Sequence, residues 1–183
     1  RYNFGRWIWH SSLASFTKIL SKTIFKINWP KNIISRSCFK AYILKCHYRG
    51  PDNNNTYRDD NITLGHNLLS ITDVPSVGVQ PWKTDKGNIL IYNGEIFNYY
   101  DLCNKYKNFI PKTQCDTELL AWGLDEFGID FIEQIDSMHA FALWDIRKKQ
   151  LILSRDHAGI KPLYYYIDKE RIIFASEIKS ILE

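Results

Sequence analysis

The sequence lacks any hydrophobic run close to the roughly 18–20 apolar residues that a membrane-spanning helix needs, so we expect no membrane insertion. It also lacks a Cys-x-x-C pair, and its four cysteines are widely spaced: Cys38, Cys46, Cys103 and Cys115. Such spacing is typical neither of a zinc site nor of a disulfide framework, so we expect no metal and a reducing, cytoplasmic location. The 45% of hydrophobic residues among 183 is ample for a buried core.

Acidic residues are absent from the first 51 positions, which contain ten Lys or Arg residues. The remaining residues include 14 basic and 20 acidic side chains, so the overall charge of +4 arises entirely from the N-terminal segment. The main domain therefore gives no electrostatic reason to expect nucleic-acid binding. We treat residues 1–48 as a basic segment that has diverged or carries an insertion; a damaged reading frame would also explain it.

The basic segment has an amphipathic pattern that predicts a helix beginning after Ser11 and Ser12 and ending at Trp29-Pro30. Its apolar residues recur at helical spacing: Leu13, Phe16, Ile19, Leu20, Ile24 and Ile27. An organelle transit peptide or a membrane-surface helix shares this pattern. The regular apolar stripe favours a helix packed on the domain, and a second short helix is predicted over residues 38–45.

The pattern of the remaining chain predicts an α+β fold. A helix is expected from Asp116 to Phe127, stopped by Gly128, and a shorter one over residues 100–106. Residues 53–55 should form a polar loop and residues 61–71 an extended segment, and a last helix should begin at Ser176. Two antiparallel hairpins are predicted, pairing residues 140–144 with 151–154 and 163–167 with 172–175.

A predicted strand over residues 88–92 leads into Asn93-Gly94. Asn-Gly is typical of a sharp turn because glycine accepts a positive φ, and taken alone it favours an ordinary hairpin. The pair also places a side-chain amide beside a backbone N–H that no Cβ shields, and two converging donors are what an oxyanion needs. Asp116 likewise has an ordinary interpretation, as the N-cap of its helix.

Several motifs occur in an order that resembles one family: Arg49-Gly-Pro-Asp52, Leu64-Gly-His-Asn-Leu-Leu-Ser-Ile71, Gln80-Pro81, Asn93-Gly-Glu-Ile96, Asp116-Thr-Glu118, Ala140-Phe-Ala-Leu-Trp-Asp145, Arg155-Asp156, Gly159-Ile-Lys-Pro-Leu-Tyr164 and Ala175-Ser-Glu-Ile-Lys179. Residues 49–183 resemble the N-terminal glutaminase domain of glutamine-hydrolysing asparagine synthetase, a class II glutamine amidotransferase. The resemblance implies the N-terminal-nucleophile hydrolase fold, a four-layer sandwich with two antiparallel sheets between helical layers.

The resemblance also implies an activity in asparagine biosynthesis. The domain would release ammonia from glutamine, and a C-terminal synthetase domain, a ligase, would use ATP and magnesium to amidate aspartate with it. That second domain is missing from this chain, so no cofactor is expected here. A homodimer is left open.

The resemblance assigns roles to named residues. Asn93 and Gly94 match the oxyanion hole, and Gly94 with Glu95 matches the glutamine-binding turn. Asp116 matches the carboxylate that pairs with the substrate's ammonium. Ile71 and Thr72 belong to the loop whose backbone borders the glutamine.

Two positions depart from the family pattern. Leu68 stands where the family has the arginine that grips the substrate carboxylate, and leucine cannot replace a cationic fork. Arg1 stands where the family has its nucleophilic N-terminal cysteine, and a guanidinium cannot attack. A non-catalytic domain with a regulatory or structural role is therefore the alternative to an enzyme. A surface-binding protein that uses residues 1–48 is a third hypothesis, and His139 is interpreted as a core substitution.

Overall fold

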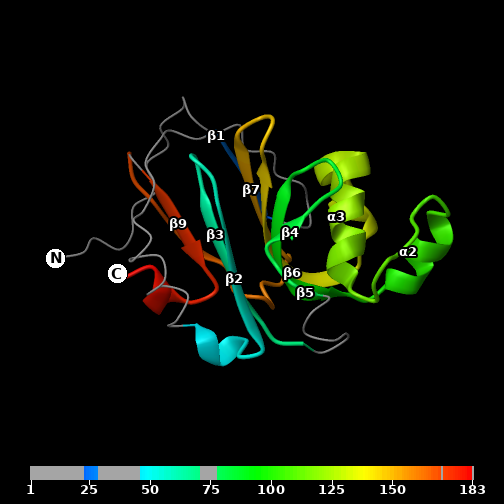
Figure 1. Ribbon diagram of the computed structural model, residues 1–183, viewed down its shortest axis with the longest axis horizontal. Helices are drawn as coiled ribbons and strands as arrows, with labels where there is room; N and C mark the ends of the chain where they lie inside the picture. The colour runs from blue at the N-terminus through cyan, green and yellow to red at the C-terminus, as the bar shows by residue number, and fades with distance from the viewer. Residues whose placement is uncertain (1–22, 29–45, 71–77, 170, 183) are drawn as a thin grey trace.

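A five-stranded antiparallel sheet forms the middle of the structure, a computed structural model that describes residues 23–28, 46–70, 78–169 and 171–182 (Figure 1). Its strand order is β1-β7-β6-β5-β4. The strands are β1 (Thr23–Asn28), β7 (Gln150–Arg155), β6 (Ser137–Asp145), β5 (Ile89–Ile96) and β4 (Trp82–Lys83). Because sequence neighbours pair along most of this sheet, it builds largely from hairpins and short connections.

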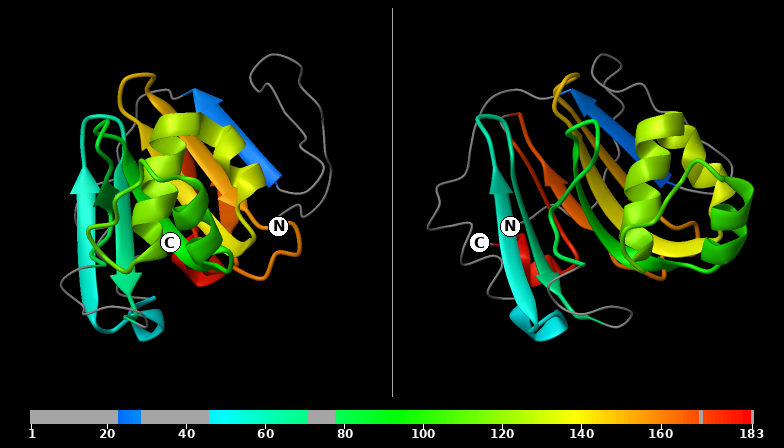
Figure 2. Two further views of the ribbon diagram at one scale, coloured as in Figure 1. Left: turned by 90° about the vertical axis from the view of Figure 1, so that its right-hand side faces the viewer. Right: turned by 45° about the vertical axis from the view of Figure 1, so that its right-hand side comes forward.

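Helices cover one face of this sheet and two hairpins cover the other (Figures 1 and 2). The helical side contains α2 (Tyr99–Lys105), α3 (Asp116–Phe127) and the 3₁₀ segment η2 (Gly128–Gln134). The hairpins are β2 (Asn53–Arg58) with β3 (Thr63–Leu68), and β8 (Tyr164–Ile167) with β9 (Ile172–Ala175). Two further 3₁₀ turns, η1 (His47–Arg49) and η3 (Ile178–Ser180), complete the described elements.

Strand β6 has a core on both of its faces, which explains its unbroken apolar run. Phe141 and Leu143 belong to the cluster that includes Leu119 and Leu120 of α3. Trp144, on the opposite face, belongs to the cluster that includes residues of the β2–β3 hairpin. The main sheet is therefore a central layer, and each outer layer is held to it by apolar contacts.

Asp59 anchors the β2–β3 hairpin to the main sheet. Its Oδ2 accepts hydrogen bonds from Trp144 Nε1 at 2.8 Å and from the Tyr57 hydroxyl at 3.0 Å. Burial raises the pKa of Asp59, but the donors around it outweigh that effect and hold the pKa below its usual value. Burial and the hydrogen bond to Asp59 raise the pKa of Tyr57 to about 12.

The predicted α+β class is confirmed, with its antiparallel hairpins and the helix from Asp116 that ends at Gly128. The described residues form three layers, so the four-layer sandwich and the domain limit at residue 49 stay predictions (Figure 2). No helix within the described ranges is long and apolar enough to cross a bilayer. The predicted helix over residues 38–45 lies outside the described residues.

Three local predictions were wrong. The end of the amphipathic helix is strand β1, because Thr23 to Asn28 pair with β7 and form an edge of the main sheet. The polar loop at Asn53–Asn55 is the start of β2, where pairing with β3 supplies partners for the backbone. The helix predicted from Ser176 is reduced to the 3₁₀ turn η3. The first part of the amphipathic helix, residues 13–22, lies outside the described residues.

Candidate functional site

A cavity of about 1150 Å³ is lined by parts of β3, β5, β9 and the start of α3. Every described residue for which the sequence predicted a substrate contact lines it: Leu68, Asn93, Gly94, Glu95 and Asp116. Ile71 and Thr72, the other two predicted contacts, lie outside the described residues. A cavity that gathers residues from distant segments of the chain is the usual form of a small-molecule site.

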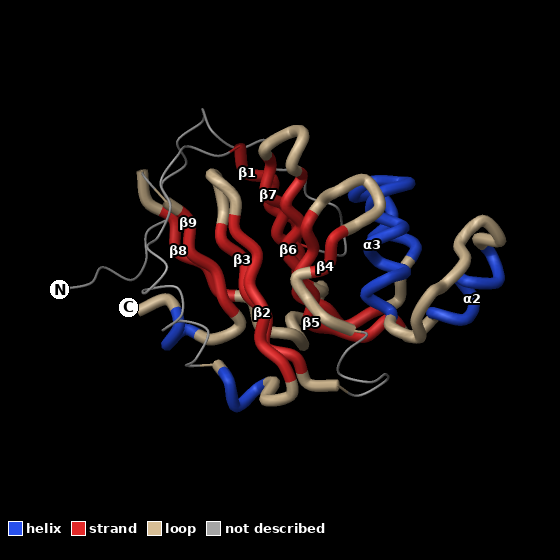
Figure 3. The backbone as a smooth tube through the Cα atoms, viewed as in Figure 1, coloured by secondary structure: helices blue, strands red, loops and turns tan. Residues whose placement is uncertain are grey.

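The sharp turn predicted at Asn93-Gly94 is absent from β5, which continues through both residues (Figure 3). Asn93 pairs with Ala140 and Gly94 pairs with His139, so the register with β6 keeps the backbone extended. Gly94 is nevertheless constrained, because a Cβ there would come within 2.4 Å of the Met138 carbonyl oxygen and 2.6 Å of the Tyr92 ring. The glycine is needed for close packing rather than for a positive φ.

One edge of β5 faces the cavity because β4 pairs only with its first two residues, Ile89 and Leu90. On this edge the Tyr92 N–H donates to Gln80 Oε1 at 2.6 Å, and the Ile96 N–H donates to Asp116 Oδ2 at 3.0 Å. Alternate residues of a strand direct their N–H groups to the same edge. The Gly94 N–H, between these two, therefore also points away from β6 and toward the cavity.

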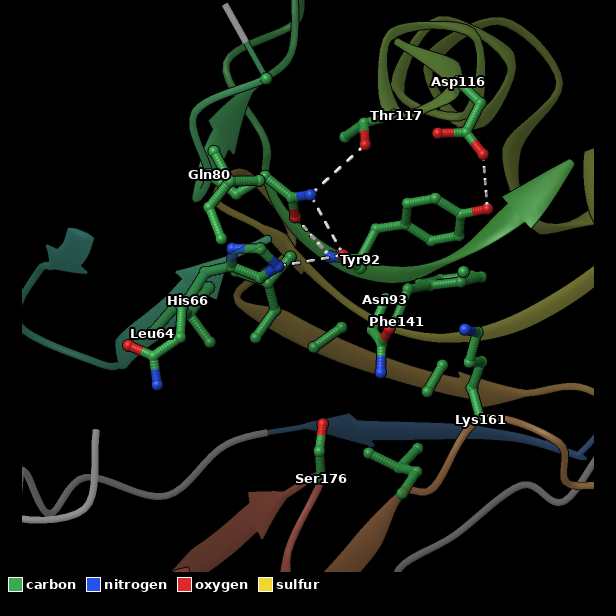
Figure 4. Close-up of a pocket in the computed structure, with 18 of the residues that line it drawn as sticks. Leu64, His66, Gln80, Tyr92, Asn93, Asp116, Thr117, Phe141, Lys161 and Ser176 are labelled. Carbon is green, nitrogen blue, oxygen red and sulfur yellow. Dashed lines mark hydrogen bonds between the residues drawn. The ribbon is translucent and has the colours of Figure 1, made fainter. Parts of the chain in front are cut away.

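Asp116 is the first residue of α3, and the N-cap position that the sequence assigned to it belongs to Cys115. Its Oδ2 also accepts a hydrogen bond from the Tyr92 hydroxyl at 3.0 Å (Figure 4). Burial raises the pKa of Asp116, although its hydrogen bonds oppose the shift, and nearby Glu95 adds to the increase. Burial and the Asp116 carboxylate raise the pKa of Tyr92 well above its usual value, so Tyr92 remains a neutral donor.

Gln80 and His66 are site residues to which the sequence analysis gave no role. Gln80 Nε2 donates to the Tyr92 carbonyl oxygen at 3.1 Å and to Thr117 Oγ1 at 3.3 Å, which ties β5 to α3. His66 Nε2 lies 3.2 Å from the same carbonyl oxygen, and it must carry the proton because a carbonyl only accepts. Burial lowers the pKa of His66 to about 4, so the ring is neutral at neutral pH.

Gln80 and His66 could have been found from the sequence, because both occur in the motifs that carry the family resemblance. Tyr92 gave no signal, because in an apolar strand an aromatic residue predicts a core position. Its ring does lie in the core, with only 4% of the residue exposed. The hydroxyl at the end of the ring is what reaches Asp116.

Leu68 lies at the end of β3, where the Arg49-to-Asp52 turn holds the backbone. The Asp52 N–H donates to the Leu68 carbonyl oxygen at 3.1 Å, and Asp52 Oδ2 accepts from the Ser70 N–H at 2.8 Å. Arg49 lines the cavity, but its guanidinium pairs with Glu177 at 2.7 Å. Position 68 therefore offers the cavity an apolar side chain and no charge.

His139 lies in the core, as predicted, with no exposed surface. Its two ring nitrogens lie 2.8 Å from Ser137 Oγ and 3.1 Å from Ser154 Oγ, so its polar atoms are satisfied inside the sheet. Among the described residues, no group of three His, Cys, Asp or Glu side chains is placed to hold a metal ion. The expectation that metal and nucleotide act outside this domain stays a prediction.

The chain is similar in sequence to a known domain family and to several known proteins. The sequence model of the glutamine amidotransferase domain family matches residues 24–183. Over 135 residues, the chain is 41% identical to a glutamine-hydrolysing asparagine synthetase of Bacillus subtilis, which covers 73% of this chain and 18% of that protein. The match to the family model therefore includes all of strand β1 except Thr23, although the sequence analysis placed this strand in the separate basic segment.

Two further relatives give the same result. Asparagine synthetase B of Escherichia coli is 38% identical over 138 residues, which are 74% of this chain and 25% of that protein. A glutamine-hydrolysing asparagine synthetase of Zea mays is 36% identical over 140 residues, which are 75% of this chain and 24% of that protein. The chain thus spans about a quarter or less of the length of these three relatives.

Proposed function

Because this chain belongs to the glutamine amidotransferase domain family, we propose that its cavity binds glutamine and that the domain releases ammonia from the bound amide. One observation carries the proposal. The cavity-facing edge of β5 presents the Gly94 N–H beside the Ile96 N–H, to which the Asp116 carboxylate is bound. A hydrogen-bond donor and a carboxylate are thereby held at a fixed separation along one strand.

That separation suits an amino acid with a side-chain amide. The two N–H groups are two residues apart, which is about 7 Å along a strand and comparable with the length of an extended glutamine. The Asp116 carboxylate would bind the α-ammonium, and the Gly94 N–H would bind the amide oxygen. The Asn93 side chain also faces the cavity and can add a second donor (Figure 4).

Hydrolysis of the side-chain amide forms a C–O bond with the oxygen of water and breaks the C–N bond, so glutamate and ammonia are the products. It builds negative charge on the amide oxygen as the carbonyl is attacked. Donors fixed before the reaction stabilise that charge, and each one typically lowers the barrier by about 3 kcal/mol. Gly94 supplies such a fixed donor because β6 and the Gln80 network hold β5 in place. The rigid strand, rather than a flexible turn, is what orients this N–H.

The names of the relatives suggest what the ammonia is for, and we extend this to the chain as part of the proposal. All three are asparagine synthetases that hydrolyse glutamine, and all are much longer than this chain. The ammonia released here would pass to a synthetase domain that amidates aspartate with ATP and magnesium. Homodimer formation remains a prediction.

A non-catalytic, glutamine-binding domain is the second candidate, and Leu68 is the observation that favours it. The apolar side chain lines the cavity at the position where the family resemblance implies a carboxylate-binding arginine. Weaker binding of the substrate carboxylate would suit a domain that senses glutamine rather than one that turns it over.

One experiment separates the two candidates. Purified chain is titrated with L-glutamine by calorimetry, and glutamate formation is followed in the same samples. Binding together with glutamate release supports the amidotransferase, and binding without release supports the sensing role. Asp116→Asn should abolish both signals, with exposed Asp60→Ala as the control. If the unaltered chain binds no glutamine, both candidates are wrong.

A further inference from the structure

The described cations that line the cavity differ in whether an acidic side chain already neutralises them. The Arg49 guanidinium pairs with Glu177 at 2.7 Å, and the Arg171 guanidinium pairs with Asp168 at 3.1 Å. His66 is neutral. Lys161 makes no ion pair with any described residue, so its ammonium is the positive charge that the described cavity wall leaves available.

The backbone of Lys161 is held on both sides, although the residue lies in a loop after β7. Its N–H donates to Asp156 Oδ2 at 3.0 Å, and its carbonyl oxygen accepts from Arg155 Nε at 3.1 Å. Asp156 is itself buried, with 3% of its surface exposed, and it also accepts the Ile160 N–H at 2.9 Å. These bonds fix where the Lys161 side chain begins and leave its ammonium free to meet a ligand.

The direction of this side chain complements Asp116. Figure 4 shows Lys161 on the same side of β5 as the Asn93 amide and on the opposite side from Asp116. The ammonium and the carboxylate of an amino acid leave the α-carbon in different directions, so the groups that bind them can lie on different parts of the cavity wall. Asp116 and Lys161 line the same cavity and have this arrangement about the Gly94 edge.

We propose that the Lys161 ammonium binds the α-carboxylate of the amino-acid substrate while Asp116 binds its α-ammonium. The inference rests on the proposed function and adds a carboxylate subsite to it. Leu68 supplies no charge, so without Lys161 the substrate carboxylate would meet no available cation among the described residues that line the cavity, and an enclosed carboxylate without a partner is costly. Lys161 would therefore select free amino acids over those whose carboxylate is blocked.

The test compares two ligands with one substitution. Calorimetric Kd values are measured for L-glutamine and for L-glutaminamide, which keeps the α-ammonium and the side-chain amide but has no carboxylate. Lys161→Met removes the charge at similar length, and Lys161→Arg keeps it. Lys148→Met makes the same change of net charge at an exposed lysine outside the cavity. Thermal unfolding of each variant establishes that it is folded.

Lys161→Met should weaken glutamine binding about 10- to 100-fold, the usual effect of losing a charge-assisted hydrogen bond. It should leave glutaminamide binding unchanged or tighter, and Lys161→Arg should retain most of the glutamine affinity. Equal glutamine affinities for Lys161→Met and the unaltered chain would overturn the subsite alone. An equal loss for both ligands would also overturn it. If the unaltered chain binds neither ligand, the proposed function is wrong and the subsite with it.

Discussion

The requirement for glycine at position 94 gives a sharp test of how β5 is built. A methyl group added there would come within 2.4 Å of the Met138 carbonyl oxygen on β6 and 2.6 Å of the Tyr92 ring. Either β5 and β6 must separate or Tyr92 must move, and a moved Tyr92 loses its 3.0 Å hydrogen bond to Asp116. Overpacking typically costs 1–3 kcal/mol, so Gly94→Ala should lower the free energy of unfolding by about 2–3 kcal/mol.

The substitution that position 94 tolerates best distinguishes a closely packed strand from a turn. In a turn with positive φ, asparagine is the preferred substitute for glycine, because its short polar side chain tolerates that conformation. In a strand packed this closely, asparagine adds more atoms than alanine and should be worse. Gly87 serves as the matched control, since its φ is +87° and its Cβ would meet nothing within 4 Å. There Gly87→Asn should be milder than Gly87→Ala.

Urea unfolding of the four variants provides the measurement, with the midpoint and the slope fitted together. At position 94, the free energy of unfolding should be highest with glycine, lower with alanine and lowest with asparagine. At position 87, it should be higher with asparagine than with alanine. The continuous strand is refuted if Gly94→Asn is more stable than Gly94→Ala. Glutamine affinity should fall in Gly94→Ala as well, because the displaced Tyr92 lies beside the N–H that the substrate would use.

Three further predictions concern single side chains. Asp116→Asn should abolish glutamine binding, which calorimetry measures. It should leave the free energy of unfolding at pH 7 unchanged or higher, because the raised pKa of Asp116 means that the folded state disfavours the ionised carboxyl group. Urea unfolding measures this second effect. Asp59→Ala should cost about 2–3 kcal/mol by leaving Trp144 Nε1 unpaired, whereas exposed Asp60→Ala should cost little. Because the folded pKa of Asp59 is lowered, its contribution should be present at neutral pH and disappear as the pH falls through that pKa. In an NMR titration, the His66 ring should stay neutral until the pH approaches its pKa of about 4. The free energy of unfolding should fall as the pH drops below the usual histidine range, because the unfolded chain gains a proton on His66 there and the folded protein does not.

Elements whose pattern is local could be predicted from the sequence. The helix α3 begins at Asp116 and ends at Gly128 as the apolar spacing and the terminal glycine indicate. The β6–β7 and β8–β9 hairpins follow from apolar runs separated by charged turns. These signals need no knowledge of distant segments, which is why they agree with the structure.

Elements that depend on distant partners could not be predicted in this way. Ile24 and Ile27 are three residues apart, a spacing that fits a helix, yet this segment pairs with β7 more than a hundred residues later. Asn93-Gly94 has the composition of a turn, but the register with β6 extends through both residues and overrides it. The same long-range pairing directs the Gly94 N–H into the cavity, so the site depends on contacts that local patterns do not reveal.

In the candidate site, too, some residues could be predicted from local motifs and others only from long-range contacts. Asp116 and Gly94 were found through motifs, whereas the hydroxyl of Tyr92 and the amide of Gln80 hold the site together through hydrogen bonds that become visible only once β5 lies against α3. At Leu68, where the resemblance implies an arginine, the cavity receives no charge, and the structure adds Lys161 as a cation from another segment that lines the same cavity.

The most direct test of the account follows the backbone amide of Gly94 by ¹⁵N–¹H NMR while L-glutamine is added. If the Gly94 N–H binds the substrate's amide oxygen, its proton resonance should move downfield and saturate together with the calorimetric binding curve. A Gly94 amide that stays in place while glutamine binds would contradict the proposed role of the β5 edge.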